Sequence, residues 1–213
     1  MPIFDSAKGD VPWYALPNAA STLFGGSTTS MQEEGTIYRA VSAGVSPAAT
    51  GSDYVLAAVS LPAYSFDGAV INDLFGGVLT AGLSNRGIAI AAQGSAGPTN
   101  STNKRIKLIV GATSAVVGQV VAGGITVADT GVFTTVSVGW SIGAEVYKYG
   151  AAGSNTQIAV HQMAQMGAAV GSLLSPQVLT LNESGNILIA LTGNATTAVA
   201  DIVANLFVLT GLN

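Results

Sequence analysis

Short runs in which apolar side chains alternate with small or polar ones recur along the later part of this 213-residue chain. In the clearest run, residues 138–149, one set of alternate positions carries Val, Trp, Ile, Ala and Val. The positions between them carry Gly, Ser, Glu and Tyr. Similar alternation occurs at 54–61, 88–93 and 105–110. A side-chain period of two is typical of a β-strand with one buried face. The pattern therefore favours an all-β fold.

Turn sequences separate these runs. Asp129–Gly131, Gly150–Gly153 and Asn182–Gly185 combine Gly, Asn and Asp, the residues that tolerate tight-turn backbone angles. The second of them predicts a hairpin between the 138–149 run and a strand beginning at Thr156. With about eight strands in this region, the spacing predicts an eight-stranded jelly-roll-like antiparallel sandwich over residues 51–213.

Two segments fit a helical as well as an extended pattern. Residues 199–209 have apolar side chains at helical spacing, but β-branched and aromatic residues dominate them, which favours a strand. Residues 163–173 also have helical spacing, interrupted by Gly167 and Gly171. Glycine inside a helix is destabilising by about 1 kcal/mol relative to Ala. We expect a loop there, with at most one helical turn.

The stretch Leu108–Ala128 carries no charge and is long enough to span a membrane as a helix. Its glycines and β-branched valines argue against that interpretation, because such residues favour strands and turns. The glycines are Gly111, Gly118, Gly123 and Gly124. We expect two buried strands joined by glycine turns, and no membrane association.

Charged residues make up only 8% of the chain, against roughly 25% in an average soluble domain. The net charge is −4, and seven basic residues are too few for the phosphate neutralisation that nucleic-acid binding requires. The absence of cysteine excludes disulfides, thiolate metal sites and cysteine nucleophiles. A surface with so little charge is typical of one that becomes covered, which predicts an oligomer or an assembly component.

Residues 1–50 differ from the rest of the chain because prolines recur along them. They nevertheless contain large apolar side chains. Proline keeps regular elements short. Phe4, Trp13 and Tyr14 would have no role in a solvated linker. We therefore expect an extended N-terminal arm that lies either on a partner or on its own domain.

No catalytic or cofactor motif occurs in the sequence. The G-x-S-x-G and P-loop patterns are missing, and the acidic residues are scattered without pairing. His161, the one imidazole, shares the parity of Gln157 rather than that of Ile158, which predicts a polar strand face and a surface or interface role. The basic cluster at 104–107 is expected to be the solvent face of a strand start. We expect no enzyme activity, no cofactor and no bound metal.

Several short segments of the sequence resemble those of a known group of proteins. These are residues 54–62, 64–68, 103–107, 139–150 and 183–190. Together they are similar to small β-sandwich structural proteins of tailed bacteriophage virions. That group includes capsid cement (decoration) proteins and head- or tail-fibre domains, which are often jelly rolls that assemble as trimers.

This resemblance implies a homotrimeric cement protein that binds the major capsid protein on the outer capsid surface of a virion. The arm residues Phe4, Trp13 and Tyr14 are then the expected capsid contacts, because buried aromatics dominate interface energies. The alternative is a fibre or spike domain that recognises a host surface glycan or receptor. Tyr147, Tyr149 and His161 are the candidates for that face, or equally for a trimer interface.

Overall fold

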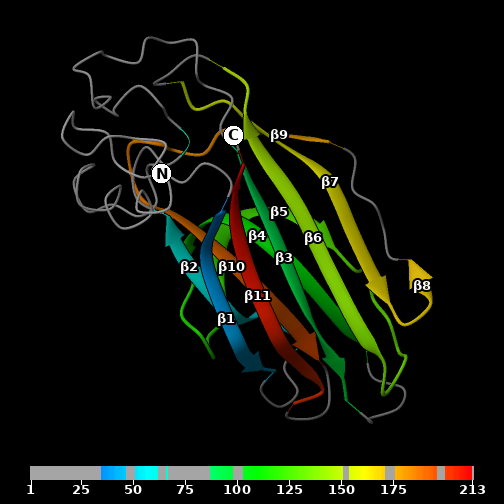
Figure 1. Cartoon of the computed structure of the whole chain (residues 1–213). Helices are drawn as coiled ribbons and strands as arrows, with labels where there is room; N and C mark the ends of the chain where they lie inside the picture. The colour runs from blue at the N-terminus through cyan, green and yellow to red at the C-terminus, as the bar shows by residue number, and fades with distance from the viewer. Residues whose placement is uncertain are drawn as a thin grey trace, which may run out of the picture.

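The computed structural model describes residues 35–46, 51–61, 66, 87–97, 103–150, 154–170, 176–195 and 200–212. Within these ranges the chain forms eleven strands and no helix (Figure 1). The strands are β1 (Gly35–Val45), β2 (Tyr54–Leu61), β3 (Gly87–Ala96), β4 (Lys104–Ser114), β5 (Ala122–Asp129), β6 (Gly139–Lys148), β7 (Gln157–Met166), β8 (Ala169–Val170), β9 (Gln177–Leu179), β10 (Ile187–Ala195) and β11 (Ile202–Leu212).

The strands form two antiparallel sheets. The first has the order β1-β11-β3-β6-β7-β8, with β9 also paired to β7, and the second has the order β2-β10-β4-β5. The pairs are nested along the chain: β1 with β11, β2 with β10, β3 with β6, and β4 with β5. Such nesting folds one long antiparallel hairpin into the two sheets of a jelly roll. The structure thus confirms the expected sandwich and adds β7, β8 and β9 to the eight nested strands.

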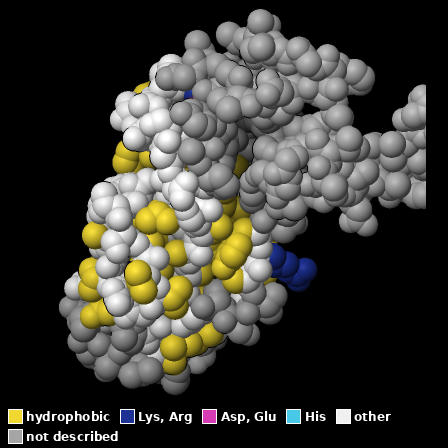
Figure 2. All heavy atoms as spheres, turned by 90° about the vertical axis from the view of Figure 1, so that its left-hand side faces the viewer, with side chains coloured by type: hydrophobic (Ala, Val, Ile, Leu, Met, Phe, Trp, Pro, Cys, Tyr) yellow, Lys and Arg dark blue, Asp and Glu magenta, His cyan; other side chains and the backbone are white. Residues whose placement is uncertain are grey.

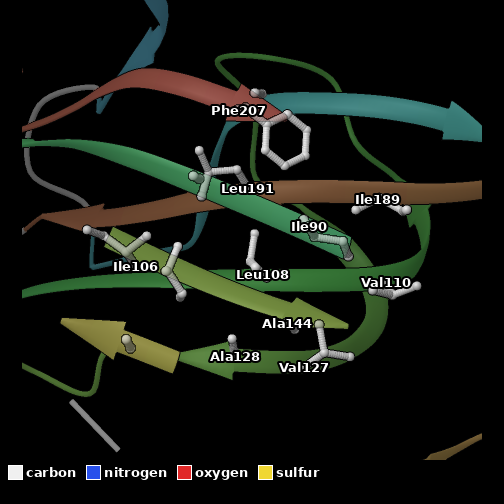
Figure 3. Packing of buried hydrophobic residues seen from close by; sticks show 14 of the residues in the cluster. Ile90, Ile106, Leu108, Val110, Val127, Ala128, Ala144, Ile189, Leu191 and Phe207 are labelled. Atoms are coloured by element: carbon white, nitrogen blue, oxygen red, sulfur yellow. The ribbon is translucent and has the colours of Figure 1, made fainter. Parts of the chain in front are cut away.

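The core lies between the two sheets. Side chains from both point into the space between them, including Ile90 and Phe207 from the first sheet and Leu108 and Leu191 from the second (Figure 3). Alanines such as Ala92, Ala144 and Ala159 share this inward face. Small inward residues beside large ones let the two sheets interdigitate closely.

The first strand lies inside the segment that we expected to be an arm. Gly35–Val45 pairs with β11 along its length, and the Ser46 amide donates to the Ile202 carbonyl at 2.8 Å. The sandwich therefore begins no later than Gly35, rather than at residue 51. The prolines that suggested irregular structure lie on either side of this strand, at positions 2–17 and at Pro47. Residues 1–34 lie outside the described ranges.

Of the two segments with mixed patterns, the first is a strand, and the described part of the second, up to residue 170, is strand, turn and strand. The expected strand at 199–209 is confirmed as β11, Ile202–Leu212. The expected loop at 163–173 is wrong in its first part, because β7 continues to Met166. Its pairing with β6 places Gln165 opposite Ser141, and the turn begins at Gly167 with a positive φ of 53°. Met163 and Met166, spaced as on a helix, lie on opposite faces of the strand, exposed and buried respectively.

The uncharged stretch 108–128 forms strand, turn and strand, as expected, but Gly111, Gly123 and Gly124 lie within the strands and not in the turn, and the first half of β5 is exposed. It runs from β4 into β5, and its four glycines all adopt positive φ angles between 64° and 88°. Residues with a Cβ rarely adopt this left-handed conformation, which explains the glycines in the sequence. No helix among the described residues is long and apolar enough to cross a membrane.

Replacing Gly118 by Ala is expected to lower the free energy of unfolding by about 1 kcal/mol. Gly118 has φ +80°, and a Cβ added there would meet no atom within 4 Å, so the loss is conformational and not steric. Urea denaturation measures it. Gly185→Ala is the control, because Gly185 has no positive φ and an added Cβ would meet only the Asn182 amide nitrogen, at 3.9 Å. Equal stability of the two variants would contradict this interpretation.

Candidate functional site

The most deeply buried polar groups are structural ion pairs. Lys148 Nζ of β6 lies 2.6 Å from Glu183 Oε2, and the side chain of Gln157 donates to the other carboxylate oxygen. The backbone amide of Leu181 in turn donates to Gln157 Oε1 at 2.8 Å. Lys148, Gln157 and Glu183 are almost completely shielded from solvent, so no ligand reaches them from outside. The network joins β6 and β7 to the segment that leads into β10.

The basic cluster at the start of β4 is divided between the two faces of the strand. Arg105 and Lys107 face outward as expected, and they pair with Asp129 and Asp53. The expectation for Lys104 is wrong, because it is fully buried, with its Nζ 3.5 Å from an Asp201 carboxylate oxygen. Lys104 shares the inward parity of Ile106, which decides its position.

An exposed polar cluster lies on the outer face of the first sheet. Glu145 Oε2 accepts a hydrogen bond from the Tyr147 hydroxyl at 2.8 Å and lies 2.6 Å from His161 Nδ1. Partial burial opposes ionisation of Glu145, but the contacts with His161 and Tyr147 outweigh it and hold the pKa of this carboxyl below its ordinary value. Burial and the bond to Glu145 raise the pKa of Tyr147.

The structure brings Tyr147 and His161 together through Glu145, which sequence reasoning did not single out. Tyr149 lies just beyond the end of β6 and is 53% exposed. The expected surface position of His161 agrees with the structure, where its side chain is 74% exposed, but the parity argument behind it is wrong. Gln157 is buried, and a bulge at His161, with φ 50°, shifts the alternation by one residue. Phe4, Trp13 and Tyr14 lie outside the described residues.

The loop that joins β4 to β5 carries exposed valines. Val116, Val117 and Val120 are 51%, 55% and 48% exposed, and we call these three residues the valine surface. The loop is fixed to the edge of β2 by backbone bonds: Val55 donates to Gln119 at 2.8 Å, and Gly118 donates to Val55 at 2.9 Å. In Figure 1 it lies beside β2 on the left-hand side of the molecule.

A second apolar cluster underlies this loop. Val55, Ile109, Ala112 and Ala190 are buried on the outer face of the second sheet, where side chains of an antiparallel sandwich usually meet water. Ala115 and Val121 of the loop pack against the cluster. Figure 2 looks onto the side of the sandwich formed by β1 and β2, and its described part shows many hydrophobic side chains, little basic surface and no acidic side chain.

Sequence reasoning missed the valine surface, although it singled out the stretch that contains it. The signal was the pair Val116-Val117 next to a glycine in a segment without charge. As for metals, the described residues contain no group of three His, Asp or Glu side chains placed to hold an ion.

Comparison with known proteins assigns the chain to no family. No family model matches the chain. No curated protein matches it either. Among solved structures, the CBM2 module of the evolved Dit of Lactobacillus casei BL23 phage J-1 aligns with 78% of this chain and 75% of its own. The identity is 6% and the TM-score 0.32, and similarity at that level does not indicate what this chain binds. Within the described residues the chain is an all-β antiparallel sandwich. It carries the valine surface beside β2 and the polar cluster around Glu145 on the outer face of the first sheet.

Proposed function

We propose that this chain is a structural protein of a tailed-phage virion, of the capsid cement (decoration) type, which binds the outer surface of the capsid. The observation that carries the proposal is the valine surface. It is an exposed, uncharged apolar loop held in place by backbone bonds to β2. Contiguous exposed apolar residues of this kind mark interaction sites.

The chemistry of the valine surface favours a partner that is itself uncharged at the contact. Covering a half-exposed valine contributes about 1 kcal/mol, so three valines supply a few kcal/mol per subunit. No charged residue lies between Ser114 and Asp129 along the chain, so this loop has no charged side chain to offer a partner. The exposed basic residue Arg39 lies on β1 instead. The major capsid protein is the partner that we infer.

Trimerisation fits this mode of action. A partner that binds only the assembled shell stabilises it by mass action. Three linked copies of a weak contact act with a high effective concentration, so a few kcal/mol per subunit suffices for tight attachment. The arm residues Phe4, Trp13 and Tyr14 would add further contacts in the same proposal.

Replacing Val117 by Asp is expected to weaken binding to capsid shells at least about tenfold, since a carboxylate would lose its hydration inside an apolar contact. The fold is expected to persist because Val117 is half exposed. Co-sedimentation with shells of the encoding virus, prepared without this protein, measures the binding. A circular dichroism melt confirms the fold.

Val178→Asp is the matched control, because Val178 is at least as exposed as Val117, at 66% against 55%, but lies on β9 at the far edge of the first sheet. It is expected to bind as the unchanged chain does. Equal binding by the Val117 and Val178 variants would exclude the valine surface as the contact. Failure of the unchanged chain to sediment with shells would exclude the cement function.

A further inference from the structure

A hollow of about 370 Å³ opens on the outer face of the first sheet, away from the valine surface. Three of the residues that line it are glycines, Gly94, Gly139 and Gly167. Of these three, Gly139 is the one whose missing side chain leaves open space. Gly139 in particular is exposed, and a Cβ added to it would meet only the Gly94 carbonyl oxygen, at 3.7 Å.

Neutral polar side chains from four neighbouring strands meet at this hollow. Gln93 of β3 is paired with Ser141 of β6, and Ser141 is paired with Gln165 of β7. On the other side Gln93 is paired with Leu206, and the bulge in β11 leaves the neighbouring Asn205 exposed. Gln165 Nε2 donates to the Gly167 carbonyl at 3.1 Å, which holds this amide beside the hollow.

Trp140 also lines the hollow, and its indole Nε1 is buried without a hydrogen-bond partner among the described residues. A buried donor without a partner costs about 1–3 kcal/mol, so native structures rarely leave one. The indole edge lies so close to Gly94 that a Cβ on that residue would collide with it. Both Trp140 and Gly94 face the core between the two sheets, so the ring lies beneath the hollow and not in its opening.

The lining residues define the class of ligand. The side chains that reach the hollow from the outer face are three amides, a hydroxyl and one leucine, Leu206, and none of them is charged. Amides and hydroxyls both donate and accept hydrogen bonds, which matches the hydroxyl groups of a sugar. An anionic ligand would lack a cation here, and an apolar ligand would leave the amides unpaired. The volume lies within the range of small-molecule sites.

We propose that this hollow binds a neutral saccharide of one or two rings through Gln93, Ser141, Gln165 and Asn205. The first sheet lies in front of the second in Figure 1, so its outer face is directed away from the second sheet's apolar cluster. A subunit attached to a shell through the valine surface would display the hollow outward. The saccharide site does not depend on that attachment, and the experiment below requires no shell.

The test is binding of the full chain to an array of neutral oligosaccharides built from glucose, galactose and N-acetylglucosamine, with sulfated and sialylated glycans beside them. Calorimetric titration with the best neutral binder then gives its affinity. Gln93→Ala is expected to weaken it at least tenfold, and Gly139→Val to abolish it by filling the hollow.

Gln119→Ala is the matched control, because Gln119 is an exposed glutamine on the β4–β5 loop. It is expected to bind like the unchanged chain. Gly139→Val is expected to keep its melting temperature, since Gly139 is exposed and a Cβ added there meets only the Gly94 carbonyl oxygen, at 3.7 Å, so a loss of binding there is not a loss of fold. No binding to neutral glycans at millimolar concentration, binding to charged glycans alone, or binding by the Gln93 and Gly139 variants as tight as that of the unchanged chain would each overturn the proposal.

Discussion

Replacing Glu183 by Gln is expected to lower the free energy of unfolding by about 3 kcal/mol, because it leaves the buried ammonium of Lys148 without a counter-ion. Lys148 Nζ is 2.6 Å from the Glu183 carboxylate and also donates to the Ser154 carbonyl, with no route to water. The substitution preserves the shape of the side chain, so the effect measures charge and not packing. Urea denaturation followed by circular dichroism gives the difference.

The double variant Lys148→Met with Glu183→Leu is expected to recover most of this loss. Replacing both members of a buried pair by apolar residues of similar volume is often neutral, whereas removing one leaves an uncompensated charge. Glu145→Gln is the control for a carboxylate at the surface, since the Glu145 side chain is 29% exposed and its partner His161 is 74% exposed, and it is expected to change stability by less than about 1 kcal/mol. If Glu183→Gln were as mild as Glu145→Gln, the buried pair would have no structural importance.

Truncating Phe207 to Ala is expected to cost about 3–5 kcal/mol, the range for a large aromatic in a close-packed core. Phe207 is fully buried on β11, and its ring meets that of Tyr38 on β1 edge to face, with 5.9 Å between the centroids. Figure 3 shows the ring among side chains of the facing sheet, near Leu191. Its removal would leave a cavity where the two sheets meet.

Val208→Ala, one position along the same strand, is the control for this truncation. Val208 points to the outer face and is only partly buried, so its loss is expected to be about 1 kcal/mol or less. Thermal and urea unfolding of both variants measure the difference. Equal losses at 207 and 208 would contradict the assignment of inward and outward faces on β11.

The sequence permits prediction of most strands because their patterns are local. The alternation at 54–61 and 138–149, and the hairpin between β6 and β7, follow from neighbouring residues alone. The nested pairing of β1 with β11 does not, because it joins the two ends of the described chain. A bulge such as the one at His161 also escapes a period-two analysis, since one extra residue reverses the faces beyond it.

The two outer surfaces were harder to predict than the strands. Tyr147 and His161 could be proposed from their residue types, but their meeting at Glu145 depends on the register of β6 and β7. The row of Gln93, Ser141 and Gln165 depends in addition on β3 lying beside β6, which no local pattern indicates. The valine surface lies in a loop, where periodicity carries no information about what a side chain covers.

A reconstruction by electron cryomicroscopy of capsid shells incubated with the purified chain tests the central claim most directly. The account predicts jelly-roll density in groups of three on the outside of the shell, with the 115–121 loop against the capsid and the outer face of the first sheet directed away from it. Shells without added density, or subunits attached through the outer face of the first sheet, would contradict it.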